Sequence, residues 1–260
     1  AAEGPEGDGT ITLECLAAAL AACQNGKSPG RDGLPYEVYK RFWGELGPLL
    51  TDALADVFEH GPHSAEWAQG VIALLYKGKG ARDDLASYRP ITLLNCDYKL
   101  ASRVISDRLQ RPLDFLIDPC QTAFIAGRCI DANIHTRQLL ADYLDAEQEA
   151  GVMLIMDVSK AYDRVDRGWL MRCAAEMGLP AGMRRWFERF MTDTTAQVTV
   201  NGWLSGSFPV CNGLPQGGPL APPLYVLQQQ PLAAALRRAQ ADGQLSAPRL
   251  AARRRTARGR

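Results

Sequence analysis

Apolar side chains recur three and four residues apart along most of the chain, which is the spacing of one helix face. The first helix is predicted over residues 12–24, where Leu13, Leu16 and Leu20 share a face and Asn25–Gly26 end the pattern. A second helix is predicted from Pro35 to Trp43, because proline is favoured in a first helical turn. The same spacing predicts helices over residues 46–60, 95–116, 168–177, 182–191 and 220–241, and one around Leu139, Leu140 and Tyr143.

Three shorter segments have the pattern of strands. Residues 71–76 form an apolar run, and residues 196–200 alternate before Asn201–Gly202, a dipeptide typical of a hairpin turn. Residues 77–90 are polar and contain glycine, so they are predicted to be a loop. Local helices around a few strands predict an α+β fold.

Residues 151–156, Gly-Val-Met-Leu-Ile-Met, are predicted to be the third and buried strand, with residues 157–163 as its exit turn. A carboxylate at the end of a buried strand, here Asp157, can be held rigidly enough to bind a divalent metal ion. The residues alone leave a second interpretation open, in which Asp157 caps the turn and Tyr162 belongs to the core.

Composition and charge exclude several classes of protein. The chain has 260 residues, 47% of them hydrophobic, and no apolar run long enough to span a membrane. The first residues resemble no signal peptide, and the absence of an initial Met indicates a fragment of a longer frame. Seven scattered cysteines without a Cys-x-x-Cys pair argue against zinc and favour an intracellular protein, in nucleus or cytoplasm.

The net charge is zero but unevenly distributed. Residues 237–260 hold eight arginines and one acidic residue, so the rest of the chain carries a net charge of −7. Phosphate binding must therefore be local, and residues 77–111, with eight basic and four acidic residues, are the better candidate.

Residues 213–220, Gly-Leu-Pro-Gln-Gly-Gly-Pro-Leu, form a loop whose glycines allow a ligand to approach the backbone. At this point the chain resembles the reverse transcriptases of LINE-type (non-LTR) retrotransposons. Five segments carry the resemblance in family order: Gly26–Leu34 (GKSPGRDGL), Ser87–Asn95 (SYRPITLLN), Gln121–Arg128 (QTAFIAGR), Asp157–Asp163 (DVSKAYD) and Gly213–Leu220 (GLPQGGPL).

The resemblance implies the fingers and part of the palm of a right-hand polymerase, helix-rich with a small antiparallel sheet. The fingers are expected over residues 10–150 and the partial palm over 151–236. Residues 1–9 are expected to be disordered, and residues 237–260 to be a basic low-complexity tail.

The resemblance also implies roles for single residues in two-metal nucleotidyl transfer. Asp157 is the expected catalytic metal ligand, with the Val158 carbonyl as a second ligand of Mg²⁺ or Mn²⁺. Tyr162 is expected to exclude the ribose 2′-hydroxyl, although a core tyrosine remains the alternative. The remaining expected contacts to the deoxynucleoside triphosphate are Lys77 or its competitor Lys79, Arg89, Lys160, Ala161, Gln216 and Gly217.

The expected partners are an RNA template and a DNA primer, and no membrane. Lys27, Arg31 and Arg128 are candidates for contacts with template phosphates. The structural alternatives are solvated charges for the basic residues and an ordinary Gly/Pro turn around Gln216.

The resemblance stops before the Ala-Asp-Asp segment that supplies two further aspartates in the family. After residue 236 only Asp242 remains, without the flanks of a hairpin strand. Two functions therefore stand: a reverse transcriptase domain that is truncated and inactive in this chain, or a non-catalytic nucleic-acid-binding remnant. A group II intron-type reverse transcriptase is a weaker relative.

Overall fold

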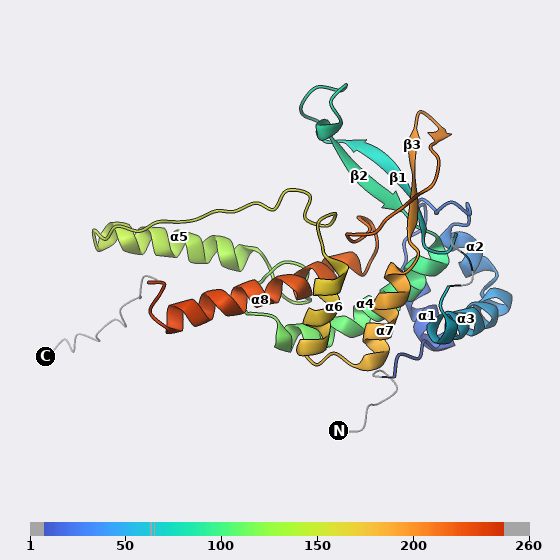
Figure 1. The fold of residues 1–260 in the computed structure, drawn as a ribbon, viewed down its shortest axis with the longest axis horizontal. Helices are drawn as coiled ribbons and strands as arrows, with labels where there is room; N and C mark the ends of the chain where they lie inside the picture. The colour runs from blue at the N-terminus through green and yellow to red at the C-terminus, as the bar shows by residue number, and fades with distance from the viewer. Residues whose placement is uncertain (1–7, 63, 65, 247–260) are drawn as a thin grey trace, which may run out of the picture.

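The computed structural model describes residues 8–62, 64 and 66–246 and shows helices packed beside one small sheet (Figure 1). The predicted α+β class is confirmed. In chain order the helices and strands are α1 Leu13–Ala21, α2 Tyr36–Arg41, α3 Trp43–His60, β1 Gln69–Tyr76, the short 3-10 helix η1 Leu85–Ser87, β2 Tyr88–Leu93, α4 Cys96–Leu116, α5 Asp131–Ala146, α6 Arg167–Glu176, α7 Ala181–Met191, β3 Thr195–Val200, β4 Trp203–Leu204, β5 Phe208–Pro209 and α8 Ala221–Ala241.

The sheet has the order β2-β1-β3-β4, and β5 also pairs with β3. β1 pairs antiparallel with β2 but parallel with β3, so the expected antiparallel sheet is wrong in this one pairing. Helices α4 to α7 lie between β2 and β3 in the chain, and such a long connection permits a parallel neighbour. The predicted hairpin at Asn201–Gly202 is confirmed, with φ of 50° and 84° at the two turn residues.

The β1–β2 hairpin projects from the helical body, and β3 runs beside it (Figure 1). The predicted loop over residues 77–90 is too long, because β2 begins at Tyr88 and includes Pro90. Proline cannot donate a backbone hydrogen bond, but β2 is an edge strand of this sheet, where that loss is tolerated.

The core lies among the helices, with α4 at its centre. α4 buries Leu100, Ile105 and Leu109 completely or almost completely, on the apolar face that the sequence predicts. At its start, the buried Tyr98 hydroxyl donates to the Phe190 carbonyl of α7 at 3.0 Å. This packing fixes the base from which the sheet and the motif loops extend.

Residues 151–156 are not a strand, contrary to the prediction. They have no regular structure and pair with no strand in the part of the chain that the structure describes, and Val152 and Ile155 are 100% and 81% exposed. An isolated strand leaves its backbone groups without hydrogen-bond partners, so apolar character alone cannot create one.

The two predicted terminal segments fall partly outside the described residues, which exclude 1–7 and 247–260. Gly9 is buried, and its carbonyl accepts a hydrogen bond from the Trp186 indole at 2.6 Å. Helix α8 continues through Pro231 to Ala241, so the first residues of the expected tail are helical. Within the described residues no helix combines the length and apolar character needed to cross a bilayer.

Candidate functional site

The Gly/Pro-rich loop at residues 213–218 is attached on one side to β2. The Gln216 carbonyl accepts a hydrogen bond from the Thr92 N–H at 2.7 Å. Gly217 has a φ of 128°, and a Cβ there would lie 2.6 Å from the Thr92 carbonyl oxygen. Because L side chains rarely adopt this φ and the strand backbone is so close, glycine is required at this position.

The other side of the same loop is attached to the turn after Asp157. The Gly213 N–H donates to the Val165 carbonyl at 2.9 Å, and the Leu214 N–H donates to the Tyr162 carbonyl at 3.0 Å. A Cβ at Gly213 would lie 2.9 Å from the Asp163 Cα. The structure thus joins three of the five motif segments, which lie far apart in sequence, through backbone contacts.

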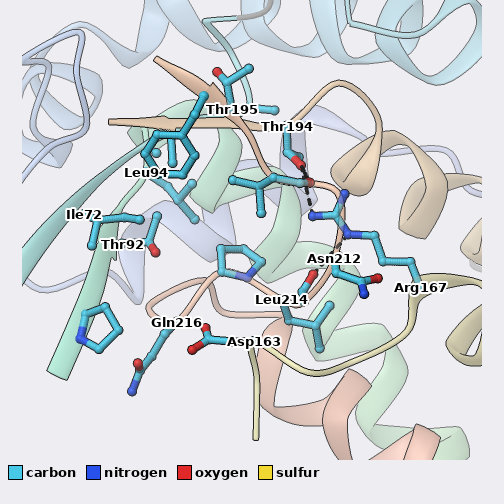
Figure 2. A pocket seen from close by; sticks show the side chains of 18 of the residues that line it. Ile72, Thr92, Leu94, Asp163, Arg167, Thr194, Thr195, Asn212, Leu214 and Gln216 are labelled. Carbon is cyan, nitrogen blue, oxygen red and sulfur yellow. Dashed lines mark hydrogen bonds between the residues drawn. The ribbon is translucent and has the colours of Figure 1, made fainter. Parts of the chain in front are cut away.

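A cavity of about 200 Å³ opens beside this junction, and Figure 2 shows the side chains around it. Its walls are mainly apolar and come from β1, β2, β3 and the 213–216 loop. Gln216 and Asp163 stand at one end of the labelled group in Figure 2, and Arg167 at another. Of the predicted site residues in the described chain, Gln216 lines this cavity, whereas Asp157, Tyr162, Lys77 and Arg89 do not.

Arg167 holds the cavity wall together, and the sequence analysis assigns no role to it. Its guanidinium donates to the Gly213 carbonyl at 3.1 Å, the Met191 carbonyl at 2.6 Å and the Thr194 hydroxyl at 3.0 Å. Burial lowers its pKa from the usual arginine value. The available signal was a cation in the first turn of a helix, where the helix dipole disfavours positive charge.

Asp157 lies in the irregular segment after residue 150 and is exposed, as is Val158. The expected placement at a strand end is therefore wrong. Among the described residues there is no group of three or more His, Cys, Asp or Glu side chains that could hold a metal ion. The role of Asp157 and Val158 as metal ligands stays a prediction.

Residues 159–164 form the turn that follows. Lys160 has a φ of 52°, and its carbonyl accepts the Arg164 N–H at 3.2 Å. The Tyr162 ring is partly buried against Tyr225, with centroids 5.3 Å apart, and burial raises its pKa. Ala161 is also partly buried. The core interpretation of Tyr162 accounts for these contacts, and its contact with a nucleotide stays a prediction.

The basic residues that are predicted to contact the triphosphate lie on the β1–β2 hairpin. The Lys77 ammonium donates to the Ala86 carbonyl at 2.7 Å, across the hairpin loop. The side chains of Lys79 and Arg89 are exposed and make no hydrogen bond or ion pair with another described residue. The structure therefore separates Lys77, which contacts its own loop, from two cations that are exposed to solvent.

The candidates for template contact differ in how fully their side chains are engaged. Lys27 is exposed. The Arg31 guanidinium donates to the Gln69 side-chain oxygen and lies 3.8 Å from a Glu66 carboxylate oxygen. These contacts fasten the 26–34 motif to the start of β1.

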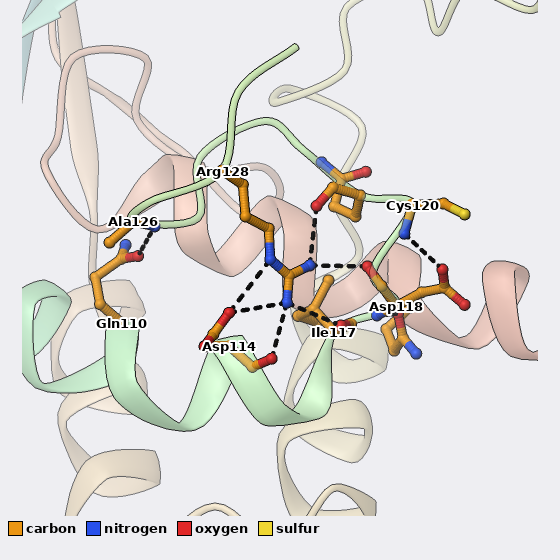
Figure 3. Close-up of polar contacts among 9 residues, drawn as sticks. Gln110, Asp114, Ile117, Asp118, Cys120, Ala126 and Arg128 are labelled. Carbon is orange, nitrogen blue, oxygen red and sulfur yellow. Dashed lines mark hydrogen bonds and ion pairs between the residues drawn. The ribbon is translucent and has the colours of Figure 1, made fainter. Parts of the chain in front are cut away.

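Arg128 is surrounded by acceptors from the last turn of α4 and the segment that follows it (Figure 3). Its side chain is 15% exposed. It donates to the Asp114 carboxylate at 3.0 Å and to the carbonyls of Asp114 and Asp118, each at 2.8 Å. Further bonds reach the Gln121 and Ile117 carbonyls at 3.0 and 3.3 Å. This arrangement gives Arg128 a structural role, and template contact stays a prediction.

Comparison with known proteins gives one matching family, described as reverse transcriptase (RNA-dependent DNA polymerase), over residues 77–246. The chain is 32% identical over 231 residues to the transposon TX1 uncharacterized 149 kDa protein of Xenopus laevis, which covers 88% of this chain and 17% of that protein. It is 27% identical over 217 residues to the RNA-directed DNA polymerase from mobile element jockey of Drosophila melanogaster, covering 83% and 24%. It is 25% identical over 202 residues to the Pol polyprotein of retrotransposable element R2 from Popillia japonica, covering 76% and 27%.

Proposed function

We propose that this chain, which belongs to the reverse transcriptase (RNA-dependent DNA polymerase) family, supplies the nucleotide- and template-binding part of an RNA-directed DNA polymerase. The relatives named above confirm the resemblance to proteins of non-LTR retrotransposons. Because the chain spans only 17 to 27% of their length, the activity of the whole protein is part of the proposal.

One observation carries the proposal. The loop containing Gln216 is bonded through its backbone both to β2 and to the turn that follows Asp157. β2 contains Arg89 and follows the hairpin loop that contains Lys79. A polymerase must bring its phosphate-binding cations, its metal ligand and its nucleotide-selecting loop around one substrate. A shared backbone junction is the kind of support that such positioning requires.

We assign residues 10–150 to the fingers and residues 151–236 to the first part of the palm. In this assignment the Asp157 carboxylate and the Val158 carbonyl are ligands of Mg²⁺ or Mn²⁺, ions that would stabilise the attacking and leaving oxygens. Tyr162 would select against the ribose 2′-hydroxyl. The other proposed nucleotide contacts are Lys77, Arg89, Gln216, Gly217 and the backbone of Lys160 and Ala161, and the proposed template contacts are Lys27, Arg31 and Arg128.

A non-catalytic nucleic-acid-binding module is the alternative function. The irregular, exposed segment around Asp157 favours it, because a metal ligand must be preorganised. The two functions differ in chemistry, since both require nucleic-acid binding and only the polymerase forms a new phosphodiester bond.

Primer extension on poly(rA)–oligo(dT) with Mg²⁺ or Mn²⁺ tests whether residues 1–260 carry polymerase chemistry. We expect no extension by the chain of residues 1–260, because one palm aspartate cannot hold two metal ions at the required separation. An active reverse transcriptase is the positive control, and Asp157→Ala is the matched variant. Extension by the unaltered chain but not by Asp157→Ala would contradict the expected inactivity and establish polymerase chemistry in these residues.

A further inference from the structure

The loop at the end of the β1–β2 hairpin is closed by two tyrosine hydroxyls. Tyr76, at the end of β1, donates to the Gly80 carbonyl at 2.6 Å. Tyr88, at the start of β2, donates to the Arg82 carbonyl at 2.8 Å. The two residues are register partners, and their ring centroids are 5.5 Å apart. At the loop end of each strand, a tyrosine therefore lies near its partner and binds the loop backbone through its hydroxyl.

Further contacts make the same loop compact. The Arg82 guanidinium lies 5.0 Å from the Tyr76 ring centroid. The Asp84 carboxylate accepts the Ala86 N–H at 2.8 Å and caps η1. Gly80 has a φ of 86°, and a Cβ there would collide with the Ser87 hydroxyl. A loop with this density of internal contacts has few alternative conformations, although it is exposed.

The charged groups of the loop divide into two kinds. The Lys77 ammonium is engaged with the Ala86 carbonyl, and Arg82 covers an aromatic ring. The side chains of Lys79 and Arg89, by contrast, are exposed and make no hydrogen bond or ion pair with another described residue. Residues 77–89 hold four basic and two acidic residues, so the loop has a net positive charge on a body that is otherwise acidic.

We propose that Tyr76 and Tyr88 are positioning residues that hold this loop in a preformed shape, so that Lys79 meets a phosphate of a bound nucleic acid. The inference rests on the proposed function and adds to it which side chains fix the hairpin and which lysine contacts phosphate. Preorganisation strengthens binding because the loop does not have to be ordered at the moment of association.

A salt titration of a fluorescent primer–template distinguishes the effect of the loop's shape on binding from the effect of its charge. Each phosphate contact contributes close to one unit to the slope of log affinity against log salt concentration. Lys79→Gln should therefore lower the affinity and reduce the slope by about one unit. Tyr76→Phe with Tyr88→Phe keeps both rings and every charge, so the affinity should fall about threefold to tenfold per lost hydroxyl while the slope stays unchanged. Arg137→Gln, an exposed charge on α5, is the control and should change neither quantity.

Trypsin cleavage after Lys79 and Arg82 measures the shape of the loop without any ligand. The double Phe variant should be cut faster at both sites than the unaltered chain. Equal cleavage rates, equal affinities, or a reduced slope in the Phe variant would overturn the proposal. A chain that binds no primer–template would refute the proposed function instead, and the cleavage rates would still decide whether the tyrosines hold the loop.

Discussion

Single arginines in this molecule hold backbone segments together through hydrogen bonds. Arg128 and Arg167 both direct their guanidinium groups at main-chain carbonyls, whereas Lys79 and Arg89 remain exposed. The sequence distinguishes none of these four residues, because each is a cation in or near a motif. Only the three-dimensional arrangement shows which of them are engaged, so the motif identifies a candidate and the fold decides its availability.

Gly217 gives the most local prediction. Gly217→Ala adds a Cβ 2.6 Å from the Thr92 carbonyl oxygen at a φ of 128°, and it should lower the free energy of unfolding by about 1–3 kcal/mol. The matched control is Gly206→Ala, because a Cβ at Gly206 meets nothing within 4 Å. Urea unfolding of the two variants measures the effect, and equal stability would show that the loop is not held against β2.

Asp97, in the first turn of α4, predicts a dependence of stability on pH. Burial, and secondarily the nearby Asp32 carboxylate, raise its pKa to about 6, above the value of about 3.9 in an unfolded chain. The folded state therefore binds the proton more tightly, and this stability is present below pH 4 and lost as the pH rises through 6. The total loss is about 3 kcal/mol.

Asp97→Asn should remove this loss. The unfolding free energy of the variant relative to the unaltered chain should increase between pH 4 and pH 7. Asp107→Asn, at an exposed carboxylate of the same helix, is the comparison variant. A flat difference for Asp97→Asn would mean that burial does not raise the pKa of this carboxyl in the folded state.

At the scale of elements, local pattern predicted helices better than strands. The apolar spacing located α1, α4, α6 and α7 because a helix satisfies its own backbone hydrogen bonds. A strand depends on a neighbour that is distant in sequence. The pairing of β1 with β3 was therefore not predictable, and residues 151–156 were predicted as a strand that the described chain does not form.

Two isoleucine substitutions test whether residues 151–156 are exposed in the folded protein. Ile155→Ala should change the unfolding free energy by less than about 0.5 kcal/mol, because Ile155 is 81% exposed. The same substitution at Ile105, which is 1% exposed in α4, should cost about 2–5 kcal/mol. Thermal or urea unfolding measures both. A large loss at Ile155 would indicate that the segment is buried in solution, as its sequence predicts.

At the scale of the whole molecule, the motifs predicted the family but not the assembly. Their order along the chain identified the segments around Tyr88, Asp157 and Gln216, and the 213–218 loop does join the other two regions by backbone bonds. The anchoring residues could not be predicted, because Arg167 contacts acceptors from two segments distant in sequence, residues 191–194 and the 213–218 loop. An ion pair between Asp118 and Arg237 likewise fixes the end of α8, within what sequence alone identifies as a tail.

In the proposed polymerase, the hairpin, the turn after Asp157 and the 213–218 loop surround one nucleotide. Photo-crosslinking with 8-azido-dATP in the presence of Mg²⁺ and primer–template, followed by peptide mapping, tests this arrangement. We expect labelling within residues 77–89, 157–163 or 213–218, suppressed by excess dATP and weakened in Arg89→Ala and Gln216→Ala. Labelling confined to other segments, or unaffected by dATP and by both substitutions, would contradict it.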